Sequence, residues 1–259
     1  ASNDVLGKNF NRILITLIQT LAQNIDLENS NSSSEWLEDC ENLLISINDP
    51  EGVRAIINDL LQLISPNNSV NTDSIKIAAL TMLNSFCSKT DADYSGQVDE
   101  MLKRLLNLFV EKNEKILEVA WTCINSILVE SQLVKEYGST FLIQRLSTIK
   151  QTLRLITQFH FELQTNRIYE ATINNSDNKQ ILMSQFHLPG FCLPNRKGIA
   201  CLLPVFKEGL LNGSPDVKEQ SALTLCECIK LTNSDALKTS VMGITGPLIR
   251  VLGERYSWS

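Results

Sequence analysis

The segment DSIKIAALTMLNSF, residues 73–86, carries apolar side chains at the spacing of one helix face. Its stripe consists of Ile75, Ala79, Leu83 and Phe86, which are four, four and three residues apart. An α-helix with 3.6 residues per turn brings positions at this spacing onto one face. Similar spacing occurs in three other sets, which are Trp36, Cys40, Leu44 and Ile47; Ile116, Ala120, Ile124 and Ile127; and, less regularly, Val217, Ser221, Leu225 and Cys228. The first three sets begin 39 and then 41 residues apart, which indicates a repeat of about 40 residues.

Between these stripes lie second helical segments with broader apolar faces, at residues 53–64 and 98–109. Helix starts are indicated where Asp49 precedes Pro50, at Thr72 or Asp73, and where Ser214 precedes Pro215, because these residue types favour the cap and the first turn. The helix over 214–231 is expected to pair with a partner helix at roughly 235–253. Two helices per unit of about 40 residues are typical of HEAT and armadillo repeats, which stack to bury both apolar faces. We therefore expect an all-α HEAT-repeat solenoid of roughly five helical hairpins.

The repeat is interrupted after a long helix predicted near residue 156. The segment NRIYEATINNSDNKQILMSQFHLPGFCLPNRKG, residues 166–198, is first polar and rich in Asn and then rich in Pro and Gly. We expect hairpins over residues 1–164, a loop excursion over 165–196 that ends in PGFCLP, and further hairpins of the same solenoid over 197–259. A loop of this length within a compact domain suggests a function.

Charge is unevenly distributed along the 259 residues, which have a net charge of -6. Residues 1–140 contain 10 Lys and Arg against 20 Asp and Glu, whereas residues 141–200 contain 7 against 3. An acidic half is poorly suited to lie along nucleic acid, because phosphate binding requires basic side chains. The seven cysteines are an odd number and mostly lie in apolar helical patterns, which indicates free thiols of a reduced, intracellular protein. We find neither a membrane-spanning window nor a secretory signal.

Two residues of the loop suggest chemistry, since His187 and Cys192 are five residues apart. A catalytic pair also needs an orienting group and an oxyanion site, and the second histidine, His160, lies on an apolar helix face. The sequence CEC at 226–228 points its two sulfurs to divergent sides of a helix, which does not suit zinc. We therefore expect no catalytic, metal or cofactor site, and interpret HLPGFCLP as a rigid plug with apolar pegs. A hydrolase remains the third hypothesis.

Charged residues provide the candidate contacts for a partner. The second helices of the repeats usually line the concave surface of a solenoid. There the sequence places Arg54 and Asp59 on one helix and Lys103, Arg104 and Glu111 on the next. A basic group that brackets the interruption consists of Arg167, Lys179, Arg196 and Lys197, and an acidic run consists of Glu35, Glu38, Asp39 and Glu41. The basic group suits ribosomal RNA and the acidic run suits docking, although both also suit simple solvation.

Three segments carry a family resemblance, which are HLPGFCLPNRKG at 187–198, LNGSPDVKEQSA at 211–222 and ITGPLIRVLGERYSW at 244–258. In this order they resemble the C-terminal part of the giant HEAT-repeat co-activator of the general-control kinase, which phosphorylates eukaryotic initiation factor 2. Residues 1–180 match only through the HEAT periodicity.

The resemblance implies a cytoplasmic, ribosome-associated scaffold in the amino-acid starvation and stalled-ribosome response. It implies recruitment of the kinase through its RWD domain, and an ABC-type protein partner elsewhere on the full-length scaffold. The partner-binding candidates are then Arg54, Asp59, Lys103, Arg104, Arg196 and Lys197. The alternative is a ribosome- or RNA-contacting HEAT module, in which nucleic acid is touched only as ribosomal RNA.

Overall fold

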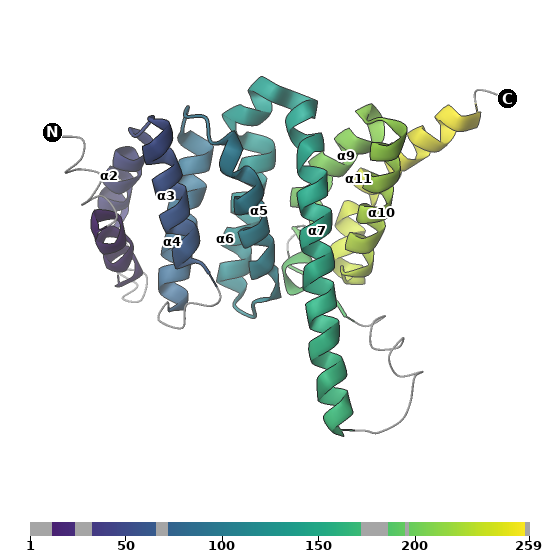
Figure 1. Ribbon diagram of the computed structural model, residues 1–259, viewed down its shortest axis with the longest axis horizontal. Coiled ribbons are helices and arrows are strands. Elements are labelled where there is room, and N and C mark those ends of the chain that lie inside the picture. The colour runs from purple at the N-terminus through teal and green to yellow at the C-terminus, as the bar shows by residue number, and fades with distance from the viewer. Residues whose placement is uncertain (1–11, 24–32, 66–71, 172–185, 195–196, 257–259) are drawn as a thin grey trace. The chain divides into compact units, whose positions relative to one another are not determined.

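The computed structural model describes residues 12–23, 33–65, 72–171, 186–194 and 197–256 (Figure 1). Within these ranges every regular element is a helix, which confirms the predicted all-α HEAT-repeat fold. The chain divides into two compact units, Ala1–Gly138 and Ser139–Ser259. None of the helices in the described ranges is long and apolar enough to cross a membrane.

The first unit consists of two layers of helices. Its elements are a helix at 12–23, α2 (Ser33–Ile45), α3 (Pro50–Leu63), α4 (Asp73–Lys89), α5 (Val98–Asn107) and α6 (Glu114–Asn125), with short turns η1 (Ser95–Gln97) and η2 (Leu108–Val110) and the π-helical η3 (Ser126–Glu130). In one layer α4 packs on α2 and on α6, and in the other α5 packs beside α3. Because α3 also contacts α4 and α5 also contacts α6, the two layers interlock as stacked hairpins require.

The helices begin at the capping residues that the sequence predicts. The Asp49 carboxylate accepts a hydrogen bond from the Gly52 amide at 2.7 Å, directly before Pro50. Ser214 accepts from the Val217 amide, again directly before a proline. Thr72, rather than Asp73, caps α4. These side chains satisfy amides that would otherwise lack partners in the first turn of each helix.

The predicted stripes form the core of the first unit. Ala79, Leu83 and Phe86 on α4 are buried, and Ile75 at its start is half-buried. The set from Ile116 to Ile127 is fully buried as well. The side chains of Trp36 and Cys40 lie outside the described part of the chain. An aromatic residue that the stripes did not include, Tyr94, is fully buried and donates its hydroxyl to the Cys87 carbonyl at 3.1 Å.

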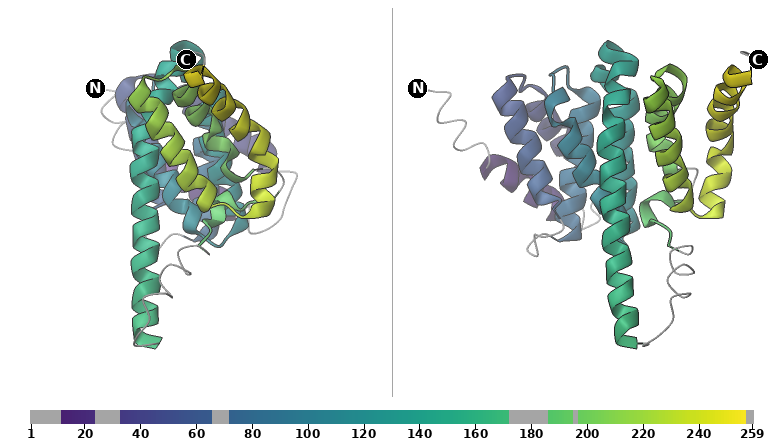
Figure 2. Two further views of the ribbon diagram at one scale, coloured as in Figure 1. Left: turned by 90° about the vertical axis from the view of Figure 1, so that its right-hand side faces the viewer. Right: turned by 45° about the vertical axis from the view of Figure 1, so that its right-hand side comes forward.

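The second unit also has two layers (Figure 2). Its elements are the part of α7 (Gln132–Ala171) that follows the kink at Gly138, then η4 (Pro189–Phe191), η5 (Gly198–Leu202), α9 (Leu203–Asn212), α10 (Pro215–Lys230) and α11 (Ser234–Tyr256). The helix α9 packs against both α10 and α11. The helix α7 lies beside α10, where Lys150 is hydrogen-bonded to Gln220 and Arg154 Nη2 lies 3.5 Å from Glu227 Oε1.

Two features of this unit differ from the expectation. The loop excursion was expected from residue 165, but α7 continues to Ala171, because residues 161–171 contain neither Pro nor Gly and can extend the helix. The helices 214–231 and 235–253 were expected to form a hairpin with each other. Instead α10 packs most closely on α9, because Gly209 lets the Ser221 side chain approach the helix backbone.

Candidate protein-docking surface

The predicted surface begins on α3, whose sequence separates a buried face from an exposed one. Val53, Ile56 and Leu60 are buried against the neighbouring helices. Arg54 is exposed, and Asp59 is half-buried beside the core face. The proline at the first helical position and the Asp49 cap fix the start of α3, and therefore fix which residues face solvent.

The next helix of the same layer, α5, supplies the other two predicted residues. The Nε of Arg104 donates to Glu100 Oε1 at 2.8 Å, and Lys103 Nζ lies 3.8 Å from the other oxygen of that carboxylate. The Nη1 of Arg104 reaches Ser65 Oγ, at the end of α3, at 3.4 Å. The structure therefore brings Lys103 and Arg104 together, both close to half-exposed, beside the C-terminal end of α3.

Arg54 lies at the other end of this layer. It precedes Ser65 by eleven residues, which corresponds to about 16 Å along a helix axis. The predicted residues of the first unit therefore form a strip along α3 and α5 rather than one compact cluster. We call Arg54, Asp59, Lys103 and Arg104 the α3–α5 strip.

Two acidic residues that were expected at the surface instead form ion pairs with lysines of the first unit. Glu111, expected beside Lys103 and Arg104, forms an ion pair with Lys76 at 3.0 Å in which the lysine side chain is 11% exposed. Glu41, expected in an exposed acidic run, is buried between α2 and α4, where it accepts from Ser85 Oγ at 2.6 Å and pairs with Lys89. Glu38 and Asp39 are exposed, so the run is divided between solvent and core. Local sequence gave no signal for these pairs, because their partners are 35 to 48 residues away.

The predicted basic group cannot be assembled from the described residues. Arg196 and Lys179 lie outside them, as does the side chain of Arg167. Lys197 is half-buried and directly precedes η5.

The HLPGFCLP segment packs onto the turn between α10 and α11. Leu188, Phe191 and Leu193 are buried, and the Leu188 amide donates to the Leu231 carbonyl at the end of α10 at 2.7 Å. Gly198 has a φ of 38° beside this segment, a conformation that favours glycine. The segment therefore has the predicted role of a plug built on apolar pegs.

The structure also shows the surroundings of Cys192 and His187, the two residues of this segment that suggested chemistry. The Sγ of Cys192 accepts a hydrogen bond from the Asn233 amide at 3.4 Å, and burial raises the pKa of this thiol, which is the opposite of what a nucleophile needs. His187 is exposed, and the second histidine, His160, stacks on Phe186 with ring centroids 4.6 Å apart. Burial lowers the pKa of His160. No group of residues able to hold a metal ion occurs in the described ranges. The geometry thus gives the hydrolase hypothesis no support.

Comparison with known proteins finds a family model and several relatives that match this chain. Residues 1–195 match the family described as "Stalled ribosome sensor GCN1-like, HEAT repeats". The human protein named "Stalled ribosome sensor GCN1" is 34% identical over 261 aligned residues, which include the whole of this chain. "Protein ILITYHIA" of Arabidopsis thaliana is 26% identical over 98% of the chain, and "eIF-2-alpha kinase activator GCN1" of Saccharomyces cerevisiae is 25% identical over 99%.

The chain spans 8% of the length of each of these relatives. No solved structure matches it. The alignment with the human relative covers the first unit as well as the plug and α10. From the sequence, the first unit resembled the family only through its helix periodicity.

Proposed function

The chain belongs to the GCN1-like family of HEAT-repeat stalled-ribosome sensors, and on this premise we propose that it is a non-catalytic scaffold segment in translational control. In the proposed role it acts in the cytoplasm, within the response to amino-acid starvation and stalled ribosomes. It binds the RWD domain of the kinase that phosphorylates initiation factor 2α and so helps to recruit or activate that kinase. The yeast relative carries the words "eIF-2-alpha kinase activator" in its name, which supports this direction.

The observation that carries the proposal is the α3–α5 strip. Its guanidinium and ammonium groups are exposed on helices whose opposite faces are packed into a two-layer core. Stacked repeats hold such a surface rigid, so that a partner loses little free energy in ordering it. Mixed charges on a rigid surface mainly set the orientation and the encounter rate of a partner, while an arginine that becomes desolvated contributes more to affinity.

A titration of the purified chain with the isolated RWD domain tests this function. We expect saturable binding, with an affinity that weakens as the salt concentration rises because exposed charges are screened. Binding that is absent at all protein concentrations, with both proteins folded by circular dichroism, would exclude this chain as an RWD-binding segment.

The second candidate is a ribosome-contacting HEAT module. The description of the matched family and the name of the human relative both contain the words "stalled ribosome sensor", and this favours a ribosomal partner. Co-sedimentation of the chain with purified ribosomes tests it. Arg196→Ala combined with Lys197→Ala would reduce the salt dependence of that binding if these side chains meet ribosomal RNA phosphates. An ABC-type partner would bind elsewhere on a full-length scaffold.

A further inference from the structure

Ser65 lies at the end of α3 and is followed in the sequence by Pro66. A serine directly before a proline is the minimal motif that proline-directed protein kinases recognise. Because a proline disfavours the helical conformation of the residue before it, Ser65 stands where the helix has ended, directly after its cap residue Ile64. Ser65 also remains partly exposed. Its position therefore suits a residue that another enzyme modifies.

The side chain beside the Ser65 hydroxyl is basic. Arg104 Nη1, from the neighbouring helix α5, lies 3.4 Å from Ser65 Oγ. Glu100 accepts a hydrogen bond from Arg104 Nε at 2.8 Å, and this holds the guanidinium group with its Nη1 towards Ser65. A guanidinium group binds two oxygens of one phosphate at the same time. A phosphate on Ser65 Oγ would therefore meet donors that the fold already holds in place.

The charges around Ser65 direct such a phosphate towards α5. Residues 60–72 contain no Asp, Glu, Lys or Arg, so the phosphate has no acidic neighbour within its own segment. The last carbonyl groups of α3 repel it with about half an elementary charge. On α5, Arg104 and Lys103 carry two full positive charges, and the carboxylate of Glu100 offsets only one of them. A phosphate with a charge of about -1.5 to -2 is thus repelled by the end of α3 and attracted by Arg104.

The chain contains a second serine before a proline, Ser214, but its surroundings differ. The Ser214 hydroxyl accepts from the Val217 amide at 3.4 Å and so caps α10, and Pro215 lies in the first turn of that helix. The acidic Asp216 follows directly. Phosphorylation of Ser214 therefore requires the start of α10 to open, and it places a phosphate close to a carboxylate. Of the two serines, the structure favours Ser65.

We propose that Ser65 is a phosphorylation site for a proline-directed kinase and that its phosphate pairs with Arg104. In this reaction Ser65 Oγ forms a bond to the γ-phosphorus of ATP, and the bond from that phosphorus to the oxygen of the β-phosphate breaks. ADP leaves, and the hydroxyl proton passes to the catalytic base of the kinase. The phosphate then links the end of α3 to α5 and neutralises Arg104, so that the α3–α5 strip loses a positive charge whichever partner it binds.

Phosphorylation of the folded chain tests the site. The purified chain and a peptide of residues 60–72 are incubated with a mitogen-activated protein kinase, Mg²⁺ and ATP, and mass spectrometry identifies the modified residues. We expect phosphate at Ser65 in both, and in the chain about tenfold faster than at Ser214, where the helix must first open. Ser65→Ala is the control and should abolish the first signal. A folded chain without phosphate at Ser65, whether or not the peptide is modified, overturns the proposal.

Phosphorus-31 magnetic resonance tests the pairing with Arg104. The second pKa of a phosphoserine is about 6, and a neighbouring guanidinium group lowers it. We expect this pKa to be lower in the phosphorylated chain than in its Arg104→Ala variant, with Arg104→Lys between the two. Arg54→Ala is the matched control, because it removes the same charge about 16 Å away along α3, beyond the range of unscreened attraction, and should leave the pKa unchanged.

Two results contradict the pairing. One is the same phosphate pKa in the wild-type chain and in Arg104→Ala, with both proteins folded by circular dichroism. The other is an equal rise of this pKa in Arg104→Ala and Arg54→Ala, which would show a general effect of net charge and not a contact with Arg104.

Discussion

At the residue scale, the structure divides the charged residues of the first unit into those that stabilise the fold and those that remain available to a partner. Glu111 and Glu41 pair with lysines between helices, whereas Arg54 is exposed. Removing one partner of a buried pair leaves a charge without compensation, but removing an exposed arginine does not. The exposed residues of the α3–α5 strip are therefore the ones at which binding and stability can be separated by mutation.

Arg54→Ala is expected to weaken RWD binding by about 1 kcal/mol or more without lowering the melting temperature, because Arg54 is exposed and a desolvated arginine is a frequent hot spot. Calorimetric titration of wild type and variant measures the effect. Arg196→Ala and Lys112→Ala are the controls and should leave the affinity unchanged. Wild-type affinity for Arg54→Ala, with both proteins folded, removes Arg54 from the site.

The thiols provide a second prediction at this scale. Burial raises the pKa of Cys87 to about 12 and raises the pKa of Cys123 and Cys228 as well, so these thiols are neither accessible nor ionised at neutral pH. Cys226 is exposed on α10. We expect a maleimide to label Cys226 within the native protein, and the three buried cysteines only on unfolding, with mass spectrometry as the readout. Rapid native labelling of Cys87 would contradict the packing of α4.

At the element scale, the second unit depends on a close contact between α9 and α10. A Cβ on Gly209 would lie 2.0 Å from Ser221 Oγ and 3.1 Å from Ser221 Cβ, so an alanine there requires the Ser221 hydroxyl to rotate away and the two helices to shift apart slightly. Because the residues at both positions are small, α9 and α10 pack closely together. The helix α10 therefore packs on α9 and not, as expected, on α11.

Gly209→Ala is expected to destabilise the protein by about 1–3 kcal/mol, which is the usual cost of overpacking. Thermal and urea unfolding followed by circular dichroism measure the change. Gly246→Ala on α11 is the matched control, since no atom lies within 4 Å of its Cβ position and alanine favours a helix over glycine. The control should be neutral or stabilising, and equal losses in the two variants would show that the contact does not set the stability.

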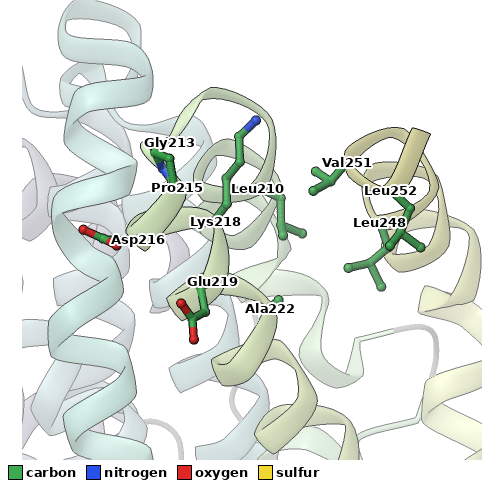
Figure 3. A pocket seen from close by; sticks show the side chains of 10 residues that line it. All are labelled: Leu210, Gly213, Pro215, Asp216, Lys218, Glu219, Ala222, Leu248, Val251 and Leu252. Atoms are coloured by element: carbon green, nitrogen blue, oxygen red, sulfur yellow. The ribbon is translucent and has the colours of Figure 1, made fainter. Parts of the chain in front are cut away.

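At the scale of the whole molecule, each of the two units is built from two packed layers of helices. Each helix buries its apolar face against its neighbours in sequence and in the layer, so the stability of one repeat depends on the next. On α11 of the second unit, Met242, Ile249 and Leu252 are exposed, and Leu252 also lines the groove with α10 (Figure 3).

Leu83→Asp and Ala120→Asp are each expected to cost several kcal/mol, because both side chains are fully buried and a carboxylate there has no partner. Hydrogen exchange should show lost protection in α4 or α6 and in the helices packed on them. Glu114→Gln, at an exposed position, should change stability by no more than about 0.5 kcal/mol. A melting temperature that is unaffected by either aspartate would contradict the repeat assignment.

The sequence alone determined the features that depend on neighbours one to four residues away. The stripe of Ala79, Leu83 and Phe86 and the caps at Asp49 and Ser214 were predicted because helix periodicity and capping are local. The resemblance carried by the plug, α10 and α11 was also visible, and the identity to relatives across the whole chain confirms it. That resemblance could not assign contacts, because a motif records residue types and not their partners.

Only the tertiary structure decided which helices became neighbours. The burial of Glu41 depends on Ser85 and Lys89, which are 44 and 48 residues away, and a local pattern contains no trace of such a pair. The separation of Lys103 and Arg104 from Arg54 along the α3–α5 strip depends on how two helices are placed side by side. The groove between α10 and α11 likewise arises because α10 packs on α9 through Gly209, and packing between distant segments is set by shape and volume rather than by periodicity.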